Sequence, residues 1–88
     1  MPNPKHFSVY LLLCSDGSLY CGIALNVSKR CEVHNAGNGS RYVRSRLPAR
    51  VVWSEVVGSR SEASKREYAI KQLTTKQKRD LVASASNR

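Results

Sequence analysis

Acidic residues are scarce in this sequence. It holds 6 Asp and Glu against 15 Lys and Arg among 88 residues, which gives a formal net charge of +9 at pH 7. A chain with so strong an excess of positive charge favours a polyanionic partner. Nucleic acid is the first candidate for that partner, and an anionic membrane surface is the second.

Long apolar runs are also absent. No stretch approaches the roughly 20 apolar residues that a membrane-spanning helix needs, which excludes that class of membrane protein. The opening MPNPKHFSVYLLLC superficially resembles a secretion signal, but its apolar run is short and its positively charged lead is the single Lys5. We therefore interpret this opening as the approach to a strand.

Cysteines are few and lie far apart. Cys14, Cys21 and Cys31 are odd in number and show no C-x-x-C spacing, so neither a disulfide framework nor a zinc site is indicated. The simpler interpretation is that they are small apolar side chains in a reducing compartment. We therefore expect a cytoplasmic protein.

The length of the chain leaves little room for elaboration. A chain of 88 residues supports one modest core and excludes linked catalytic and regulatory domains. We expect a single domain over residues 1–88, with its core over about 7–82 and a flexible tail over 83–88.

What is present begins with a β-hairpin signal. Residues 7–14, FSVYLLLC, and residues 19–25, LYCGIAL, are apolar and rich in strand-forming side chains, and the turn-forming sequence SDGS separates them. Two connections fit this pattern. One is a two-residue Asp16-Gly17 turn, and the other is a three-residue loop that starts at Ser15 and places Gly17 in the left-handed conformation.

The choice of loop decides which side chains share a face. The two-residue turn pairs Tyr10 with Ile23 and puts Tyr10 and Tyr20 on opposite faces of the hairpin. The three-residue loop pairs Tyr10 with Gly22 and Leu12 with Tyr20, so that both rings lie on one face. We predict the second register because Gly22, which has no side chain, leaves room beside the Tyr10 ring.

Helix caps and apolar spacing predict the remaining elements. Asn26 and the capping box that begins at Ser59 are good helix starts, and Gly37 is a good helix end. A basic stretch around Tyr42 is interpreted as a surface loop. The expected elements after the hairpin are a helix over 27–36, a strand over 51–57, a helix over 62–73 and a short helix over 76–82, which gives an α+β fold in the order ββαβαα.

Several side chains on these elements suit phosphodiester hydrolysis, which needs a base, cations and a metal ion. Tyr10 or Tyr20 can relay a proton if a nearby cation lowers the pKa of the phenol. Arg30 offers a planar fork for phosphate oxygens, and His34, four residues later on the same helical face, can exchange a proton near neutral pH. Glu67 can hold one Mg²⁺ whose other positions are filled by water.

Each of these residues also has a purely structural interpretation. Hairpin tyrosines are mostly packing residues, and Arg30 can be one more solvated charge. His34 suits a helix C-terminus, where the helix dipole favours a cation. Glu67 lies four residues before Lys71, a spacing that gives a surface ion pair worth about 0.3–0.5 kcal/mol. The functional interpretation rests on the expectation that these side chains converge on one side of the sheet.

The order of the motifs resembles the GIY-YIG nuclease domain, in particular its small stand-alone bacterial members related to the N-terminal domain of the excinuclease C subunit. Ser8-Val9-Tyr10 stands where the family has GIY, and Tyr20-Cys21-Gly22 stands where it has YIG, with the two tyrosines ten residues apart. Further matches are the element DGSLY ending at Tyr20, the helix with Arg30 and His34, the segment GNGSRY ending at Tyr42, and SEASKRE ending at Glu67.

The resemblance implies a three-stranded antiparallel sheet flanked by helices and a metal-dependent cleavage of DNA phosphodiesters by water, with one Mg²⁺ or Mn²⁺. It implies that the tyrosines Tyr10 and Tyr20 line the site, that Arg30 stabilises the transition state and that His34 assists proton transfer. It also implies that Tyr42 contacts the scissile phosphate or orients the other groups, and that Glu67 binds the metal. We expect further nucleic-acid contacts from the basic side chains Lys29, Arg41, Arg44 and Arg46.

Alternatives remain open at this stage. Many members of the family have an asparagine in the stretch that holds Leu81, Val82 and Ala83 here, so a basic nucleic-acid-binding module with a vestigial or partner-completed site stays in view. A basic protein bound to ribosomal RNA is a third alternative. Under the nuclease hypothesis, which is the first of the three, the chain is a structure-selective or weakly specific endonuclease in DNA repair or recombination, alone or within a larger repair complex. The sequence does not fix its oligomeric state.

Overall fold

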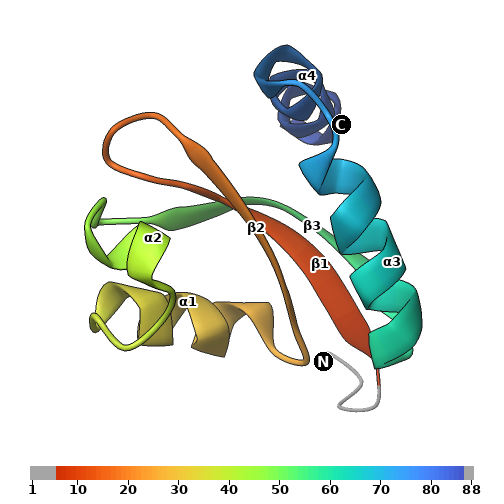
Figure 1. The fold of residues 1–88 in the computed structure, drawn as a ribbon, viewed down its shortest axis with the longest axis horizontal. Helices are drawn as coiled ribbons and strands as arrows, with labels where there is room; N and C mark the ends of the chain where they lie inside the picture. Colours follow the sequence, from red (N-terminus) through yellow and green to blue (C-terminus); the bar gives the residue numbers. More distant parts are fainter. Residues whose placement is uncertain (1–5, 87–88) are drawn as a thin grey trace.

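A three-stranded antiparallel sheet forms the centre of the structure, a computed structural model that describes residues 6–86 (Figure 1). Its strands lie in the order β2-β1-β3. They are β1 (Phe7–Leu13), β2 (Leu19–Ala24) and β3 (Arg50–Gly58). The first strand is therefore central and is hydrogen-bonded on both sides, which explains why its middle five residues are all buried.

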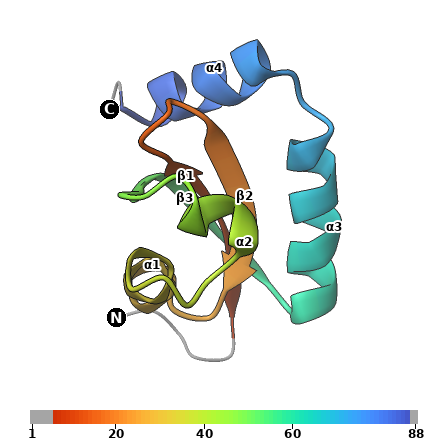
Figure 2. The same ribbon diagram turned by 60° about the vertical axis from the view of Figure 1, so that its left-hand side comes forward.

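Helices cover both faces of this sheet. They are α1 (Val27–Asn35), α2 (Arg41–Arg44), α3 (Arg60–Lys71) and α4 (Thr75–Ser86). Figure 2 shows α1 and α2 on one side of the strands, α3 on the other side, and α4 crossing the end of the sheet near the β1–β2 turn. Within residues 6–86, no helix has both the length and the apolar character needed to span a bilayer.

Alternation along β1 divides the core between the two faces. Val9 and Leu11 pack with Trp53 of β3 and with Ala63 and Ile70 of α3. The side chains of Tyr10 and Leu12, which alternate with these two along β1, belong to a separate cluster on the side of α1 and α2. Each large apolar side chain buried in this way stabilises the fold by about 1.5–3 kcal/mol.

The hairpin has the predicted three-residue loop. Gly17 adopts a φ of 84°, and the Cys14 backbone N–H donates to the Ser18 carbonyl at 2.9 Å to close the loop. The Asp16 carboxylate accepts hydrogen bonds from the Ser18 backbone N–H and hydroxyl. The predicted register, Tyr10 opposite Gly22 and Leu12 opposite Tyr20, is confirmed.

The α+β class and the antiparallel sheet are confirmed, but the observed order of elements is ββααβαα. The prediction of an uninterrupted surface loop around Tyr42 was wrong because that stretch forms the short helix α2. Ser40 caps α2 by accepting a hydrogen bond from the Val43 N–H, and Val43 is completely buried beside Tyr10 and Leu12. This segment therefore folds back to deliver an apolar side chain to the core.

The last helix also differs from the prediction. It begins at Thr75 and continues to Ser86, so the predicted bounds of 76–82 were too short, while 87 and 88 lie outside the described residues. The sequence ASAS contains neither glycine nor proline, so nothing in it terminates the helix. The other boundaries differ from the expected ones by only one or two residues.

Candidate active site

Tyr10 and His34 form a buried pair at the centre of the site. Tyr10 projects from the central strand and is 1% exposed, and His34 projects from the last turn of α1 and is 0% exposed. The Tyr10 hydroxyl oxygen and His34 Nε2 are 3.0 Å apart. Two elements that are distant in sequence thus meet through a polar contact inside the core.

Two glycines make room for this pair. A Cβ atom on Gly22 would lie 2.5 Å from the Tyr10 hydroxyl oxygen, and a Cβ on Gly39 would collide with the His34 ring. Gly22 lies opposite Tyr10 in the hairpin register. The room beside Tyr10 that the register predicted is therefore filled by the ring itself, and neither glycine can be replaced without displacing a site residue.

The hydrogen bonds of His34 assign the position of its ring proton. The Ser40 backbone N–H donates to Nδ1 at 3.3 Å, so Nδ1 is an acceptor. Burial lowers the pKa of His34, and the nearby charge of Arg30 lowers it further, so the ring is neutral at pH 7. A neutral ring whose Nδ1 accepts must carry its proton on Nε2. His34 Nε2 therefore donates to the Tyr10 oxygen.

Burial dominates the ionisation of Tyr10. It raises the pKa of the phenol to about 12, and the neighbouring Tyr20 contributes to the increase. Arg30 acts in the opposite direction, because a hydrogen bond from its guanidinium to the Tyr10 hydroxyl lowers the pKa. Tyr10 is therefore a protonated phenol at neutral pH that is already adjacent to two groups able to stabilise negative charge.

Tyr20 and Tyr42 extend this pair toward the surface. The Tyr20 ring meets the His34 ring edge to face, with centroids 5.4 Å apart. The Tyr42 ring stacks on Tyr20 at 6.0 Å and is 40% exposed. A continuous row of rings thus leads from the buried Tyr10 to an exposed tyrosine.

The basic side chains that the sequence analysis singled out fall into two groups. The first group lies on α1 and α2, the helices on the face of the sheet that carries the tyrosines. Its exposed members are Lys29, Arg30, Arg41 and Arg44. Arg46 instead has internal partners.

The Arg46 guanidinium lies 3.9 Å from the centre of the Tyr42 ring, and its Nε donates to Asp16 at 3.0 Å. It also donates to the Tyr42 carbonyl oxygen at 2.9 Å. Arg46 therefore positions Tyr42 against the hairpin loop.

Glu67 lies apart from the aromatic group. It belongs to α3, on the other side of the sheet, and the hydrogen bonds and ring contacts of the described residues do not connect it to the tyrosines. Its carboxylate pairs with Lys71 Nζ at 3.5 Å and contributes, after burial, to the raised pKa of the Cys21 thiol. Cys21 lies between Tyr20 and Gly22 on the edge strand, so the structure places the carboxylate across β2 from the tyrosines.

Sequence analysis missed the role of Asn35. Its side-chain amide donates to the Ala49 carbonyl oxygen at 2.8 Å and accepts from the Ala49 N–H at 2.9 Å. These two bonds fasten the end of α1 to the start of β3. It also missed Gly39 and Ser40, which contact His34, although both lie in the GNGSRY segment that the motif comparison had already singled out.

Comparison with known proteins places this arrangement in a family. The family described as "GIY-YIG catalytic domain" matches residues 6–80. The chain belongs to the GIY-YIG family. The resemblance inferred from the motifs is thereby confirmed, and the nuclease chemistry associated with that family becomes the one to examine in this site.

Small bacterial proteins are similar to this chain over most of its length. A UPF0213 protein of Desulfotalea psychrophila, DP2720, is 51% identical over 78 residues, which cover 88% of this chain and 71% of that protein. A UPF0213 protein of Staphylococcus aureus is 48% identical over 78 residues, covering 89% and 94% of the two chains. The solution NMR structure of EF2693 from E. faecalis has a TM-score of 0.65 at 38% identity, with 100% of this chain and 94% of that chain covered.

A divalent cation in this GIY-YIG domain would depend on Glu67. Residues 6–86 contain no group of three or more His, Cys, Asp or Glu side chains placed to hold a metal ion together. The Glu67 side chain is 22% exposed, so a partly hydrated ion can reach it. One carboxylate with several retained waters is a normal environment for Mg²⁺, which dehydrates reluctantly and takes oxygen ligands. The donor set therefore fits Mg²⁺ or Mn²⁺ if the Lys71 ammonium moves aside.

Proposed function

We propose that this protein is a metal-dependent DNA endonuclease that hydrolyses phosphodiester bonds by attack of water. The observation that carries the proposal is the buried contact between Tyr10 and His34, with Gly22 and Gly39 leaving the space it needs. A polar pair inside a small core is costly unless both groups are satisfied. Packing alone gives no reason to maintain it.

Tyr10 is the group that we assign to the proton transfer. Its oxygen accepts the Nε2 proton of His34, and its second lone pair takes a proton of the attacking water once the Arg30 guanidinium turns to the phosphate. As that proton arrives, the phenol passes its own proton to a phosphate oxygen. Because the pKa of Tyr10 is raised to about 12, this relay suits the site better than a standing phenolate does.

The other groups stabilise the charge that develops. His34 positions Tyr10 and supports the negative charge on its oxygen, and Arg30 supplies a guanidinium that fits the non-bridging oxygens. Tyr42, exposed and held by Arg46, contacts the phosphate at the mouth of the site. Glu67 would hold Mg²⁺ or Mn²⁺, which would supply neutralisation of the negative charge that develops in the transition state.

The substrate is DNA that is recognised through its backbone and shape. Lys29, Arg41 and Arg44 are exposed on α1 and α2, the helices on the tyrosine face of the sheet, and we assign them to the neutralisation of flanking phosphates. Phosphate contacts carry no sequence information directly, so we expect structure-selective or weakly specific cleavage of the kind that DNA repair and recombination use.

The test is cleavage of labelled flap, branched, single-stranded and duplex DNA with Mg²⁺ or Mn²⁺. We expect metal-dependent products with the wild type and none with Glu67→Gln. The matched control is Glu55→Gln. It neutralises another ion-paired carboxylate, because Glu55 on β3 pairs with Arg66 on α3. Cleavage by Glu67→Gln at the wild-type rate would overturn the assignment of the metal ligand.

A nucleic-acid-binding module without catalysis is the second candidate. The separation of Glu67 from the tyrosines and its ion pair with Lys71 favour it. Under this alternative the wild type binds every substrate in a salt-dependent way and cuts none, so metal-dependent turnover separates the two functions where affinity does not.

A further inference from the structure

A polar groove lies between the hairpin loop and α4, next to the proposed active site. It holds about 380 Å³ and is lined on one side by the loop residues 16–19 and on the other by Thr75, Lys78 and Arg79 of α4. Tyr42, the exposed end of the aromatic row, also lines it. The groove therefore reaches Tyr42, the residue proposed to contact the phosphate at the mouth of the site.

The charges in this groove favour an anion. In the part of the chain that the structure describes, the Lys78 ammonium and the Arg79 guanidinium take part in no hydrogen bond or ion pair. Asp16 is the one acidic side chain among the lining residues, and its carboxylate is occupied by Arg46 and Ser18. The positive charges of Lys78 and Arg79 are therefore not offset by Asp16, whose own charge is already paired with Arg46.

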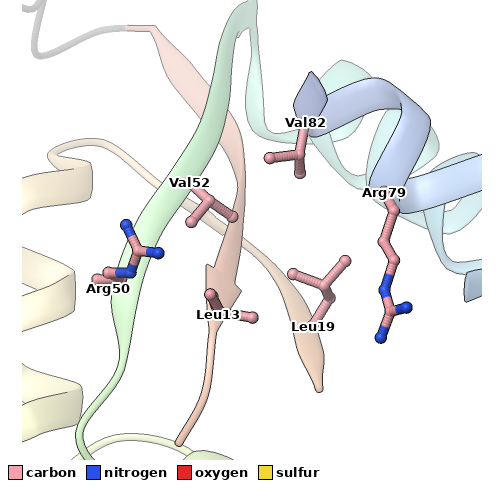
Figure 3. Close-up of a pocket in the computed structure, with 6 residues that line it drawn as sticks. All are labelled: Leu13, Leu19, Arg50, Val52, Arg79 and Val82. Carbon is pink, nitrogen blue, oxygen red and sulfur yellow. The ribbon is translucent and has the colours of Figure 1, made fainter. Parts of the chain in front are cut away.

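A second, apolar pocket adjoins the groove and shares two lining residues with it, Leu19 and Arg79. It holds about 210 Å³, and its apolar floor includes Leu13, Leu19 and Val52. Figure 3 shows Arg50 and Arg79 at opposite ends of this floor. No acidic residue lines the pocket.

We propose that these two features bind a single-stranded segment next to the cleaved phosphate. Lys78 and Arg79 hold its phosphates in the groove, and the apolar pocket takes one unpaired base between Arg50 and Arg79. An apolar floor flanked by guanidinium planes suits an unstacked base, whereas a paired base in a duplex cannot enter. This inference rests on the proposed function, since it names the part of the substrate that flanks the reaction.

Binding measured without metal tests the groove independently of cleavage. The probe is a short fluorescent single-stranded DNA in EDTA, and its affinity is measured between about 50 and 200 mM salt. We expect the double variant Lys78→Ala/Arg79→Ala to lower the slope of log affinity against log salt by about 1.4, or about 0.7 for each lost phosphate contact. The matched control, Arg60→Ala/Lys65→Ala, removes two exposed charges from α3. Equal slopes for the two double variants would overturn the proposal that Lys78 and Arg79 bind phosphates in the groove.

Arg79→Lys tests the pocket separately, because lysine keeps the charge but lacks the plane that stacks on a base. A scan with one abasic position at a time should find one position where wild-type affinity falls about tenfold. Arg79→Lys should keep the salt slope and lose that sensitivity. If no abasic position lowers the affinity of the wild type, the proposal that the apolar pocket binds a base is overturned. Wild-type metal-dependent cleavage alongside either negative result would leave the endonuclease standing and refute only this inference.

Discussion

The two faces of the sheet are built in different ways. On the α3 face, the helix contributes Ala63 and Ile70 to an apolar cluster around Trp53. On the opposite face, the single buried residue of α1 is His34, and the helix is fastened by the hydrogen bonds of Asn35. Both faces bury apolar side chains, but the buried residues of α3 are apolar, whereas that of α1 is polar and hydrogen-bonded. Changes to the α3 cluster should therefore act on stability, and changes to the Tyr10–His34 pair should act on chemistry.

The largest expected effect is that of Tyr10→Phe on the cleavage rate. The change keeps the ring and removes the oxygen that meets His34, so we expect the cleavage rate to fall about 10²–10⁴-fold. Single-turnover cleavage with Mg²⁺ measures it. The control is Tyr68→Phe on α3, a tyrosine that is 68% exposed. An active Tyr10→Phe enzyme would mean that the phenol only packs.

Ile70→Ala should produce the opposite pattern. Ile70 is 1% exposed in the α3 cluster, and deleting it leaves a cavity that lowers the free energy of unfolding by about 2–5 kcal/mol. Urea denaturation measures the loss. Cleavage per folded molecule should be unchanged, and a loss of activity in fully folded protein would break the separation between the faces.

Asn35→Ala tests how α1 is fastened on the tyrosine face of the sheet. It removes both bonds to Ala49, a buried residue whose backbone groups then lack these partners, so we expect a loss of about 1–2 kcal/mol in the free energy of unfolding. Urea denaturation again measures the loss, and Asn38→Ala in the exposed loop is the control. A variant as stable as the control would show that α1 is held by other contacts.

The smallest expected effect is a dependence of stability on pH. The pKa of His34 lies below its ordinary value of 6.5 in the folded protein because the ring is buried. The unfolded chain therefore binds a proton that the folded protein does not, and stability falls as the pH drops from about 6.5 toward the folded pKa. His34→Gln should remove this loss of stability at low pH. The difference between the urea midpoints measured above and below this pH range should therefore be smaller for the variant than for the wild type. Should the variant not fold, NMR titration of the His34 ring in the wild type reads the pKa directly, and a value at or above 6.5 contradicts the account.

Local patterns in the sequence carried most of the fold. The SDGS loop and Gly22 fixed the hairpin register, because a glycine opposite Tyr10 has a definite steric meaning. The short helix α2 was not predictable in the same way. Its arginines and tyrosine suggest a loop, and the reason for the turn is Val43, whose burial depends on how α1 and the sheet come together.

The site was predictable as a set of residues but not as a geometry. Sequence spacing placed Arg30 and His34 on one helical face, yet the direction of the Tyr10–His34 hydrogen bond depends on the Ser40 N–H, a backbone group with no sequence signature. The expected convergence of Glu67 with the tyrosines is not seen as a direct contact. Helical spacing shows which face of α3 carries Glu67, but not how far around the edge of β2 its carboxylate reaches.

The position of Tyr10 on the central strand has a consequence for how the site can move. Strand β1 is hydrogen-bonded on both sides, and its middle residues are buried, so its amides should exchange with solvent only when the whole protein unfolds. The proton relay would then be part of the slowest-opening unit of the chain and keep one shape with or without substrate. Adaptation to differently shaped substrates would fall to the exposed arginines and lysines around it, whose rotamers interchange in picoseconds to nanoseconds.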